Sequence, residues 1–131
     1  MSTKRDHQEL VVITKTYDLI LWSYHYTGKF PRNHRFVLGE RIERNLYDLL
    51  ETLRRAKYSK PCQELLEKAN LMLEILRFQM RLAKDLQCLK VYSYGFAAKA
   101  VDEIGNLVGG WLKSGVREQR HLWGGVGHPR G

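Results

Sequence analysis

The stretch from Leu71 to Leu89 constrains the fold most, because its apolar residues form two adjoining helical seams. Residues spaced by threes and fours share one face of a helix. The first seam consists of Leu65, Ala69, Met72, Leu76, Met80 and Ala83. The second consists of Leu71, Ile75, Phe78, Leu82, Leu86 and Leu89. An apolar arc this wide needs cover on more than one side, which predicts an interior bundle helix, packed by its own chain or by other subunits.

Three more amphipathic segments accompany this one. Helices are expected at about residues 7–27, 34–57, 60–89 and 93–114. The expected inward faces are Leu10, Ile13, Tyr17, Ile20 and Tyr24 in the first helix; Leu38, Ile42, Leu46, Leu49, Leu53 and Ala56 in the second; and Tyr94, Ala97, Val101, Ile104, Val108 and Trp111 in the last. Short connections force antiparallel neighbours, so the sequence predicts an all-α, up-down-up-down four-helix bundle over residues 1–115.

The end of the chain lacks this apolar periodicity. Gly115 is expected to stop the last helix, and residues 116–131 are glycine-rich and basic, which predicts a flexible tail. Gly105 and Gly109 lie inside the last predicted helix, where each glycine costs about 1 kcal/mol against alanine. They indicate either close approach of another helix or a kink.

Aromatic residues fall on or beside the apolar seams. We therefore expect them to be core or interface anchors rather than a base-stacking platform. This set is Tyr17, Tyr24, Tyr47, Phe78 and Trp111.

The chain carries 22 Lys and Arg against 14 Asp and Glu, a formal charge of +8. Such an excess indicates an acidic partner: nucleic acid, a charged membrane surface or an acidic protein. Two groups of cations stand out, one in the connection after the first helix and one along a polar stripe of the third. They are Lys29, Arg32, His34 and Arg35, and Arg77, Arg81 and Lys84. Phosphate contact requires only accessible cations of this kind.

Catalytic and metal-binding patterns are missing from the sequence. Cys62 and Cys88 have no spacing typical of a disulfide framework or a zinc site, and His25 and His34 have no neighbour that would form a nucleophile pair. We therefore expect no enzymatic activity, no metal and no cofactor. No signal peptide or membrane span is apparent, so we expect a cytoplasmic protein without a membrane partner.

Several short segments, in order and spacing, resemble one protein family. They are Phe30-Pro31-Arg32, Leu38-Gly39-Glu40-Arg41-Ile42, Leu49-Leu50-Glu51, Ala69-Asn70, Leu76-Arg77, Arg81-Leu82-Ala83, Asp85-Leu86, Glu103-Ile104-Gly105 and Gly109-Gly110-Trp111-Leu112-Lys113. The chain resembles the Avd proteins, the accessory variability determinants of diversity-generating retroelements. These belong to a wider group of four-helix-bundle proteins first met in ribosomal-RNA intervening sequences.

This resemblance implies a homopentameric barrel that binds the retroelement's reverse transcriptase and its template RNA, or the cDNA copied from it. Such a protein supports mutagenic, adenine-directed cDNA synthesis without catalysing polymerisation. The family's cations carry over to Arg32, Arg41, Arg77 and Arg81, whereas Lys29, His34, Arg35 and Lys84 are predicted contacts on electrostatic grounds. Helix-packing or oligomer contacts are expected at Phe78, Leu82, Gly105, Gly109 and Trp111.

A second interpretation of the sequence remains open. The chain could be a structural bundle protein of the intervening-sequence group, whose charge only keeps it soluble and which has no RNA or polymerase partner.

Overall fold

Four long helices make up most of a computed structural model that describes the backbone of residues 3–125 and the side chains of residues 6–115. They are α1 (Thr3–Thr27), α3 (Glu40–Lys57), α4 (Gln63–Asp85) and α5 (Val91–Gly125). A single helical turn, α2 (Arg32–His34), and a π-helical turn, η1 (Arg35–Gly39), lead from α1 into α3. Residues 3–125 contain no strand, and the predicted all-α four-helix fold is confirmed.

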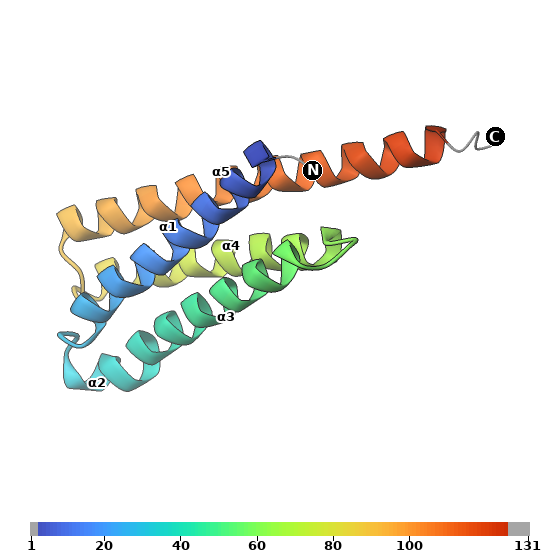
Figure 1. The fold of residues 1–131 in the computed structure, drawn as a ribbon. Coiled ribbons are helices and arrows are strands. Elements are labelled where there is room, and N and C mark those ends of the chain that lie inside the picture. The colour runs from blue at the N-terminus through green and yellow to red at the C-terminus, as the bar shows by residue number, and fades with distance from the viewer. Residues whose placement is uncertain (1–2, 126–131) are drawn as a thin grey trace.

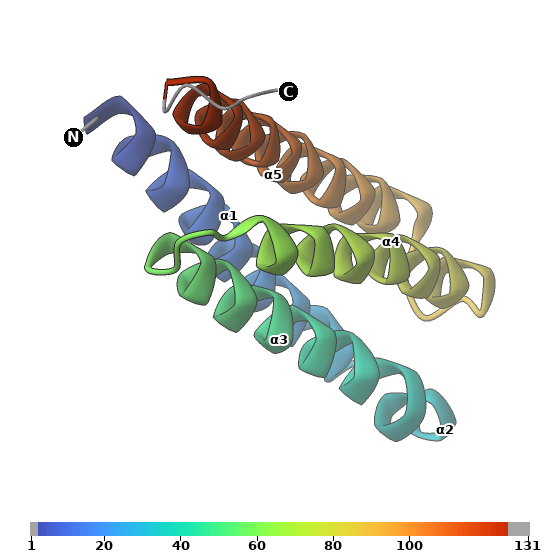
Figure 2. The same ribbon diagram turned by 90° about the vertical axis from the view of Figure 1, so that its right-hand side faces the viewer.

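Each long helix runs antiparallel to the next one in the chain (Figure 1). Helices α1 and α4 are not direct neighbours: each packs between α3 and α5. Figure 2 shows this arrangement from a second side, with α4 crossing in front of α1 and with α3 and α5 on opposite sides of that pair. One end of the bundle holds α2, η1 and the connection between α4 and α5 (Figure 1), and we call it the α2 end.

Helix α3 packs as its sequence predicts. All six expected inward residues, Leu38, Ile42, Leu46, Leu49, Leu53 and Ala56, are buried. In α5 the residues Ala97, Val101, Ile104, Val108 and Trp111 are buried as well, while Tyr94 is half-buried. These two faces form most of the core together with α4.

Helix α4 divides its two apolar seams between the inside and the outside of the chain. The buried residues are Leu66, Ala69, Leu73, Leu76, Met80 and Ala83, which are the first seam with Leu66 and Leu73 in place of Leu65 and Met72. The second seam faces outward: Leu71 is 63% exposed and Phe78 is 68% exposed. Only Leu89, which follows the helix, is buried from that seam.

The predicted inward face of α1 is wrong at three of its five residues, whereas Ile13 and Ile20 are half-buried and pack against the core. Leu10, Tyr17 and Tyr24 are exposed, and the buried face is Glu9, Val12, Thr16, Leu19, Ser23 and Thr27. Both sets have helical spacing, and the aliphatic and aromatic set was preferred on hydrophobicity. The structure buries the smaller, more polar set instead.

Local partners explain how α1 can bury three of its polar side chains, whereas the buried hydroxyl of Ser23 has no hydrogen-bond partner among the described residues. Thr16 Oγ1 donates to the carbonyl of Val12 at 2.9 Å, and Thr27 Oγ1 donates to the carboxylate of Glu43 on α3. Glu9 lies 3.5 Å from Lys57 Nζ, and both side chains are largely buried. Such satisfied groups cost little to bury, whereas a buried tyrosine must find a partner for its hydroxyl.

The expected end of the third helix at residue 89 is too late. Helix α4 stops at Asp85, because Gln87 takes a left-handed backbone conformation with φ 63°. The amide of Cys88 then donates back to the carbonyl of Ala83 at 2.7 Å, which closes the helix end.

The expected end of the last helix at Ser114 is also wrong. Gly115 does not stop α5, which continues to Gly125 and projects past the other helices (Figure 1). Residues 117–122 include good helix formers, which offset the cost of the nearby glycines. Of the predicted flexible tail, residues 116–125 are thus helical, and residues 126–131 lie outside the described residues.

The two conspicuous glycines of α5 differ. A Cβ atom on Gly105 would lie 3.0 Å from Arg77 Nη2 of α4, so this glycine makes room for a side chain of the same subunit. A Cβ on Gly109 would meet nothing within 4 Å. The expected close approach of another helix backbone is therefore absent at both glycines among the described residues, and Gly105 instead faces side chains of α4.

Candidate nucleic-acid interface

The connection after α1 is held by one buried side chain. Gly28 follows the helix, and the amides of Lys29 and Phe30 donate to the carbonyls of Tyr26 and Thr27 at 2.9 and 3.1 Å. Phe30 is only 1% exposed, so it fixes the turn to the core. Lys29 stays exposed beside it, and the chain re-enters helical structure at Arg32.

Five predicted contact residues lie on this connection or just after it, and we call them the turn cluster: Lys29, Arg32, His34, Arg35 and Arg41. Lys29, Arg32, Arg35 and Arg41 are exposed, and His34 is half-buried. They come from the turn, α2, η1 and the first turn of α3, so the structure brings them to the same end of the bundle.

The turn cluster has few partners. Arg35 Nη2 donates to the carbonyl of Phe30 at 3.4 Å, and Lys29 Nζ lies 3.2 Å from His25 Nε2. Within the described part of the chain, no carboxylate forms an ion pair with Arg32 or Arg41. These guanidinium groups remain available to an anion from outside.

The second group of predicted contacts, Arg77, Arg81 and Lys84, forms the α4 stripe. Arg77 Nε donates to Asp102 Oδ1 of α5 at 2.8 Å. Arg81 Nε lies 3.9 Å from Asp85 Oδ2, and Lys84 Nζ lies 3.6 Å from Asp85 Oδ1. All three cations thus have an acidic neighbour within the subunit.

Lys84 is further confined by an aromatic ring. Its ammonium lies 4.8 Å from the ring centroid of Tyr94, a distance typical of a cation–π contact. Its side chain is 32% exposed, against 65% for Arg81. Of the α4 stripe, Arg81 is therefore the most accessible to a phosphate.

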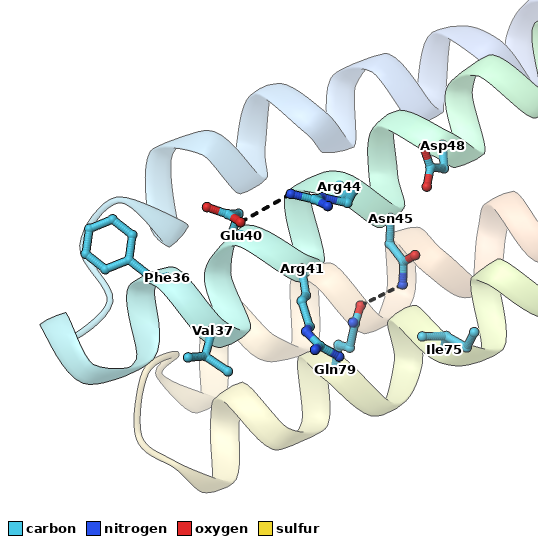
Figure 3. Close-up of a pocket in the computed structure, with 9 residues that line it drawn as sticks. All are labelled: Phe36, Val37, Glu40, Arg41, Arg44, Asn45, Asp48, Ile75 and Gln79. Carbon is cyan, nitrogen blue, oxygen red and sulfur yellow. Dashed lines mark hydrogen bonds and ion pairs between the residues drawn. The ribbon is translucent and has the colours of Figure 1, made fainter.

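A groove between α3 and α4 adjoins the turn cluster (Figure 3). Its volume is about 570 Å³, and its lining residues are Phe36, Val37, Glu40, Arg41, Arg44, Asn45, Asp48, Ile75 and Gln79. Arg44 Nη2 is paired with Glu40 Oε1 at 3.3 Å, and Asn45 Nδ2 donates to Gln79 Oε1 at 3.0 Å. In Figure 3 Arg41 extends from α3 toward Gln79 and lies at the centre of the groove.

Sequence reasoning missed the two apolar residues at the mouth of this groove. Phe36 and Val37 are each 64% exposed, because the π-helical turn directs Leu38 and Gly39 inward and leaves the preceding pair outside. π-helical turns often occur at functional sites. The sequence shows an aromatic and a β-branched residue, Phe36 and Val37, directly after Arg35. Their outward direction follows from the π-helical turn, which has no signal in the sequence.

The predicted packing residues occupy different environments. Trp111 is 9% exposed and belongs to the core, and Gly105 packs under Arg77. Phe78 and Leu82 are 68% and 47% exposed, and they make an outward apolar surface with Leu71, Ile75 and Leu86. Tyr17, Tyr24 and Tyr47 are exposed too, so of the predicted aromatic anchors only Trp111 is buried in the subunit.

The described side chains include no group of three or more His, Cys, Asp or Glu residues that could hold a metal ion. Cys62 and Cys88 are free thiols, and burial raises the pKa of Cys88. A raised pKa makes a thiol a poorer nucleophile at neutral pH. Within residues 3–125 no helix is both long and apolar enough to cross a membrane.

The family model for bAvd-like proteins matches residues 10–115. The chain belongs to the bAvd-like family. This match covers α1 from Leu10 onward, α2, η1, α3 and α4 with the turn cluster and the α4 stripe, and α5 as far as Gly115. No curated protein matches the chain.

Membership of the bAvd-like family agrees with the resemblance seen in the sequence. Proteins of this kind are generally accessory proteins without catalysis of their own. The arrangement of cations on a helical scaffold is chemically suited to binding an anion.

Proposed function

We propose that this bAvd-like protein is a non-catalytic accessory protein of a diversity-generating retroelement. It binds the reverse transcriptase and the template RNA, or the cDNA, and supports mutagenic, adenine-directed cDNA synthesis. Family membership supports the general role. The turn cluster is the observation that carries RNA binding.

The argument for the turn cluster is electrostatic. Phosphate contacts supply sequence-independent affinity, and they need cations that are not already neutralised. Arg32 and Arg41 are exposed and form no ion pair with the described residues. Arg77, Arg81 and Lys84 remain predicted contacts, but an incoming phosphate must compete there with Asp85 or Asp102. RNA should therefore rely more on the turn cluster.

The outward seam of α4 supports assembly of several subunits. Leu71, Ile75, Phe78, Leu82 and Leu86 form a long apolar surface on one helix, and surfaces of this kind usually mark an interaction site. We propose that this surface contacts another copy of the chain in a homo-oligomer, which the family resemblance implies is a pentamer. Mass measurement in solution tests the subunit number directly.

RNA binding is tested by reversing charge at two matched places. The Arg32→Glu/Arg41→Glu variant changes the turn cluster, and the Arg54→Glu/Arg55→Glu variant changes two exposed arginines near the opposite end of α3. Both variants alter net charge equally. We expect the first to weaken RNA binding about tenfold or more at about 0.1 M salt, and to reduce the salt slope by about 0.7 for each lost contact with single-stranded RNA.

The control decides how this result is read. If the Arg54→Glu/Arg55→Glu variant weakens binding as much, total charge rather than the turn cluster governs affinity. If the wild-type protein binds neither RNA nor a reverse transcriptase, the chain is a structural bundle and the proposed function is wrong.

The polymerase partner is tested by co-expression. The gene neighbourhood should encode a reverse transcriptase beside two near-identical repeats that differ at adenine positions. That polymerase should co-purify with this protein, and its adenine-directed misincorporation should fall when the protein is omitted. A gene located inside a ribosomal-RNA insertion would favour the structural role.

A further inference from the structure

Aromatic rings from α1 and α5 form a continuous ladder on the surface near the α2 end. Phe96 stacks on Trp22 with ring centroids 5.5 Å apart and planes 23° apart, and Trp22 lies 4.5 Å from Tyr26. His25 meets Tyr26 edge-on at 5.0 Å. We call Phe96, Trp22, Tyr26 and His25 the aromatic ladder.

The ladder is open to solvent at the α5 side. Phe96 is 55% exposed, although one of its faces is already covered by Trp22. Tyr92 lies one helical turn before Phe96 on α5 and is 81% exposed. The subunit thus presents two large aromatic rings that are more than half exposed.

A hollow of about 180 Å³ continues from Phe96 between α1 and α5. Its apolar lining residues are Leu19, Phe96, Ala100 and Ile104, and its polar lining residues are Lys15, Asp18 and Glu103. Lys15 Nζ is paired with Glu103 Oε1 at 3.2 Å. The hollow therefore combines apolar walls with hydrogen-bonding groups, which suits a flat ring with polar edges.

Charged groups of both signs flank the ladder and the hollow. Asp18 and Glu103 lie at the hollow, whereas Lys29 Nζ lies 3.2 Å from His25 Nε2 at the far end of the ladder. Lys90, immediately before α5, and Lys99, three residues after Phe96, are also exposed. A ligand with a polyanionic backbone and uncharged rings would place its backbone over the lysines and its rings over Phe96 and the hollow.

We propose that the aromatic ladder and the adjoining hollow bind an unpaired stretch of nucleic acid, with bases stacked on Phe96 and phosphates directed toward Lys29. This inference rests on the proposed RNA-binding function and specifies the form of the ligand. Stacking requires an exposed base face, which a single strand offers and the interior of a duplex does not. The turn cluster, in contrast, can hold phosphates of either form.

The test compares two exposed aromatic residues at different places on the full-length protein. Phe96→Ala removes the open ring of the ladder, and Tyr58→Ala removes a 76% exposed ring at the end of α3, outside the ladder and outside the outward seam of α4. Affinity is measured for a single-stranded RNA of about 12 nucleotides and for a duplex of the same length. We expect Phe96→Ala to weaken single-strand binding about tenfold, to leave duplex binding unchanged, and Phe96→Tyr to restore it.

Two further measurements keep the result interpretable. Circular dichroism and solution mass are recorded for each variant, since Phe96 also contacts Trp22. Tyr92→Ala, which removes a ring that is almost fully exposed, provides a second test with less risk to the fold. It should weaken single-strand binding selectively as well.

Several outcomes would overturn the inference. Wild-type RNA binding that is unaffected by Phe96→Ala and Tyr92→Ala would leave the proposed function standing and remove the ladder from it. A change of oligomer mass or loss of polymerase binding, with RNA affinity retained, would make the ladder a protein interface. Absence of any RNA binding by the wild-type protein would remove both proposals together.

Discussion

The turn cluster and the α4 stripe look alike in sequence but differ in what surrounds them. Each places several cations close together on or beside a helix. In the α4 stripe each cation lies within 4 Å of an acidic oxygen, from Asp102 or from Asp85. In the turn cluster, Arg32 and Arg41 have no such neighbour among the described residues. We therefore expect local charge balance, more than the number of cations, to decide which region binds phosphate.

The difference has a structural origin. Residues of the α4 stripe lie along a regular helix, where an acid at i+4 or on a packed neighbour can reach them. The turn cluster spans α2, η1 and the start of α3, where the chain changes direction and brings side chains from different turns to one end. Its availability therefore depends on how the connection is anchored.

Of the substitutions that test this difference between the two regions, Phe30→Ala should lower the free energy of unfolding most. Phe30 is buried at the base of the turn, and replacing a buried phenylalanine with alanine typically costs about 3–5 kcal/mol. The free energy of unfolding, measured with denaturant at one fixed protein concentration, should fall by that amount. RNA affinity should fall with it, because the turn cluster loses its anchor.

Phe36→Ala is the matched control for Phe30→Ala. Phe36 lies six residues later in the same connection but is 64% exposed, so its removal should change stability by less than about 0.5 kcal/mol. Equal destabilisation by the two substitutions would mean that Phe36 is buried in the assembled protein, and that another subunit covers the turn cluster.

Two glycines on α5, Gly105 and Gly109, test the packing of α5 against Arg77 of the α4 stripe, with smaller expected changes in stability. Gly109→Ala should raise the free energy of unfolding by about 1 kcal/mol, because alanine favours the helix and nothing lies within 4 Å. Gly105→Ala should gain only about half as much, since its Cβ must displace the end of Arg77, 3.0 Å away. Denaturant unfolding of both variants measures the difference.

The result at Gly109 also tests subunit packing. Destabilisation by Gly109→Ala, or a loss of oligomer mass, would contradict an open environment and would show that another chain approaches α5 there. The prediction that Gly109 contributes to an oligomer contact would then be supported.

The sequence was a good guide where apolar character and helical spacing agreed. All six predicted inward residues of α3 are buried, because no competing face of that helix is apolar. Helix α1 has two faces with equivalent spacing, and hydrophobicity favoured the wrong one. Thr16 and Thr27 are buried because partners at Val12 and Glu43 satisfy their hydroxyls, and spacing alone does not reveal those partners.

Helix ends were harder to predict than helix faces. Glycine usually ends a helix by adopting a left-handed conformation, yet here Gln87 does so and Gly115 does not. Glycine at position 115 does not end the helix because the good helix formers within residues 117–122 offset its cost, and the glycine itself carries no signal of that.

In the candidate site, too, contacts between distant parts of the chain could not be predicted from the sequence. Position in sequence identified both groups of cations, but Asp102 is 25 residues from Arg77, and their hydrogen bond follows from the packing of α4 on α5. The aromatic ladder likewise joins α1 to residues more than 70 positions away in α5. Neither juxtaposition has a signal in the local sequence.

Asp102→Asn tests whether ion pairing keeps the α4 stripe from RNA, and it should change stability least. Arg77 and Asp102 are partly exposed, and exposed ion pairs contribute about 0.2–1 kcal/mol, so the free energy of unfolding should fall by less than about 1 kcal/mol. Arg77 then keeps only Glu74, whose Oε2 lies 3.4 Å from Arg77 Nη1, as an acidic partner, and its guanidinium becomes more available to RNA. Affinity for single-stranded RNA should rise, and its salt slope should steepen by about 0.7, the value for one additional phosphate contact.

Glu51→Gln is the control that separates this effect from a change in net charge. Glu51 is exposed on α3, forms no ion pair with the described residues, and its substitution removes the same charge without releasing an arginine. A steeper salt slope in Asp102→Asn alone would mean that pairing had kept the α4 stripe from phosphate. Equal slopes in both variants and the wild type would mean that Arg77 does not face the RNA at all, and the turn cluster would then account for the basic surface at that end of the bundle.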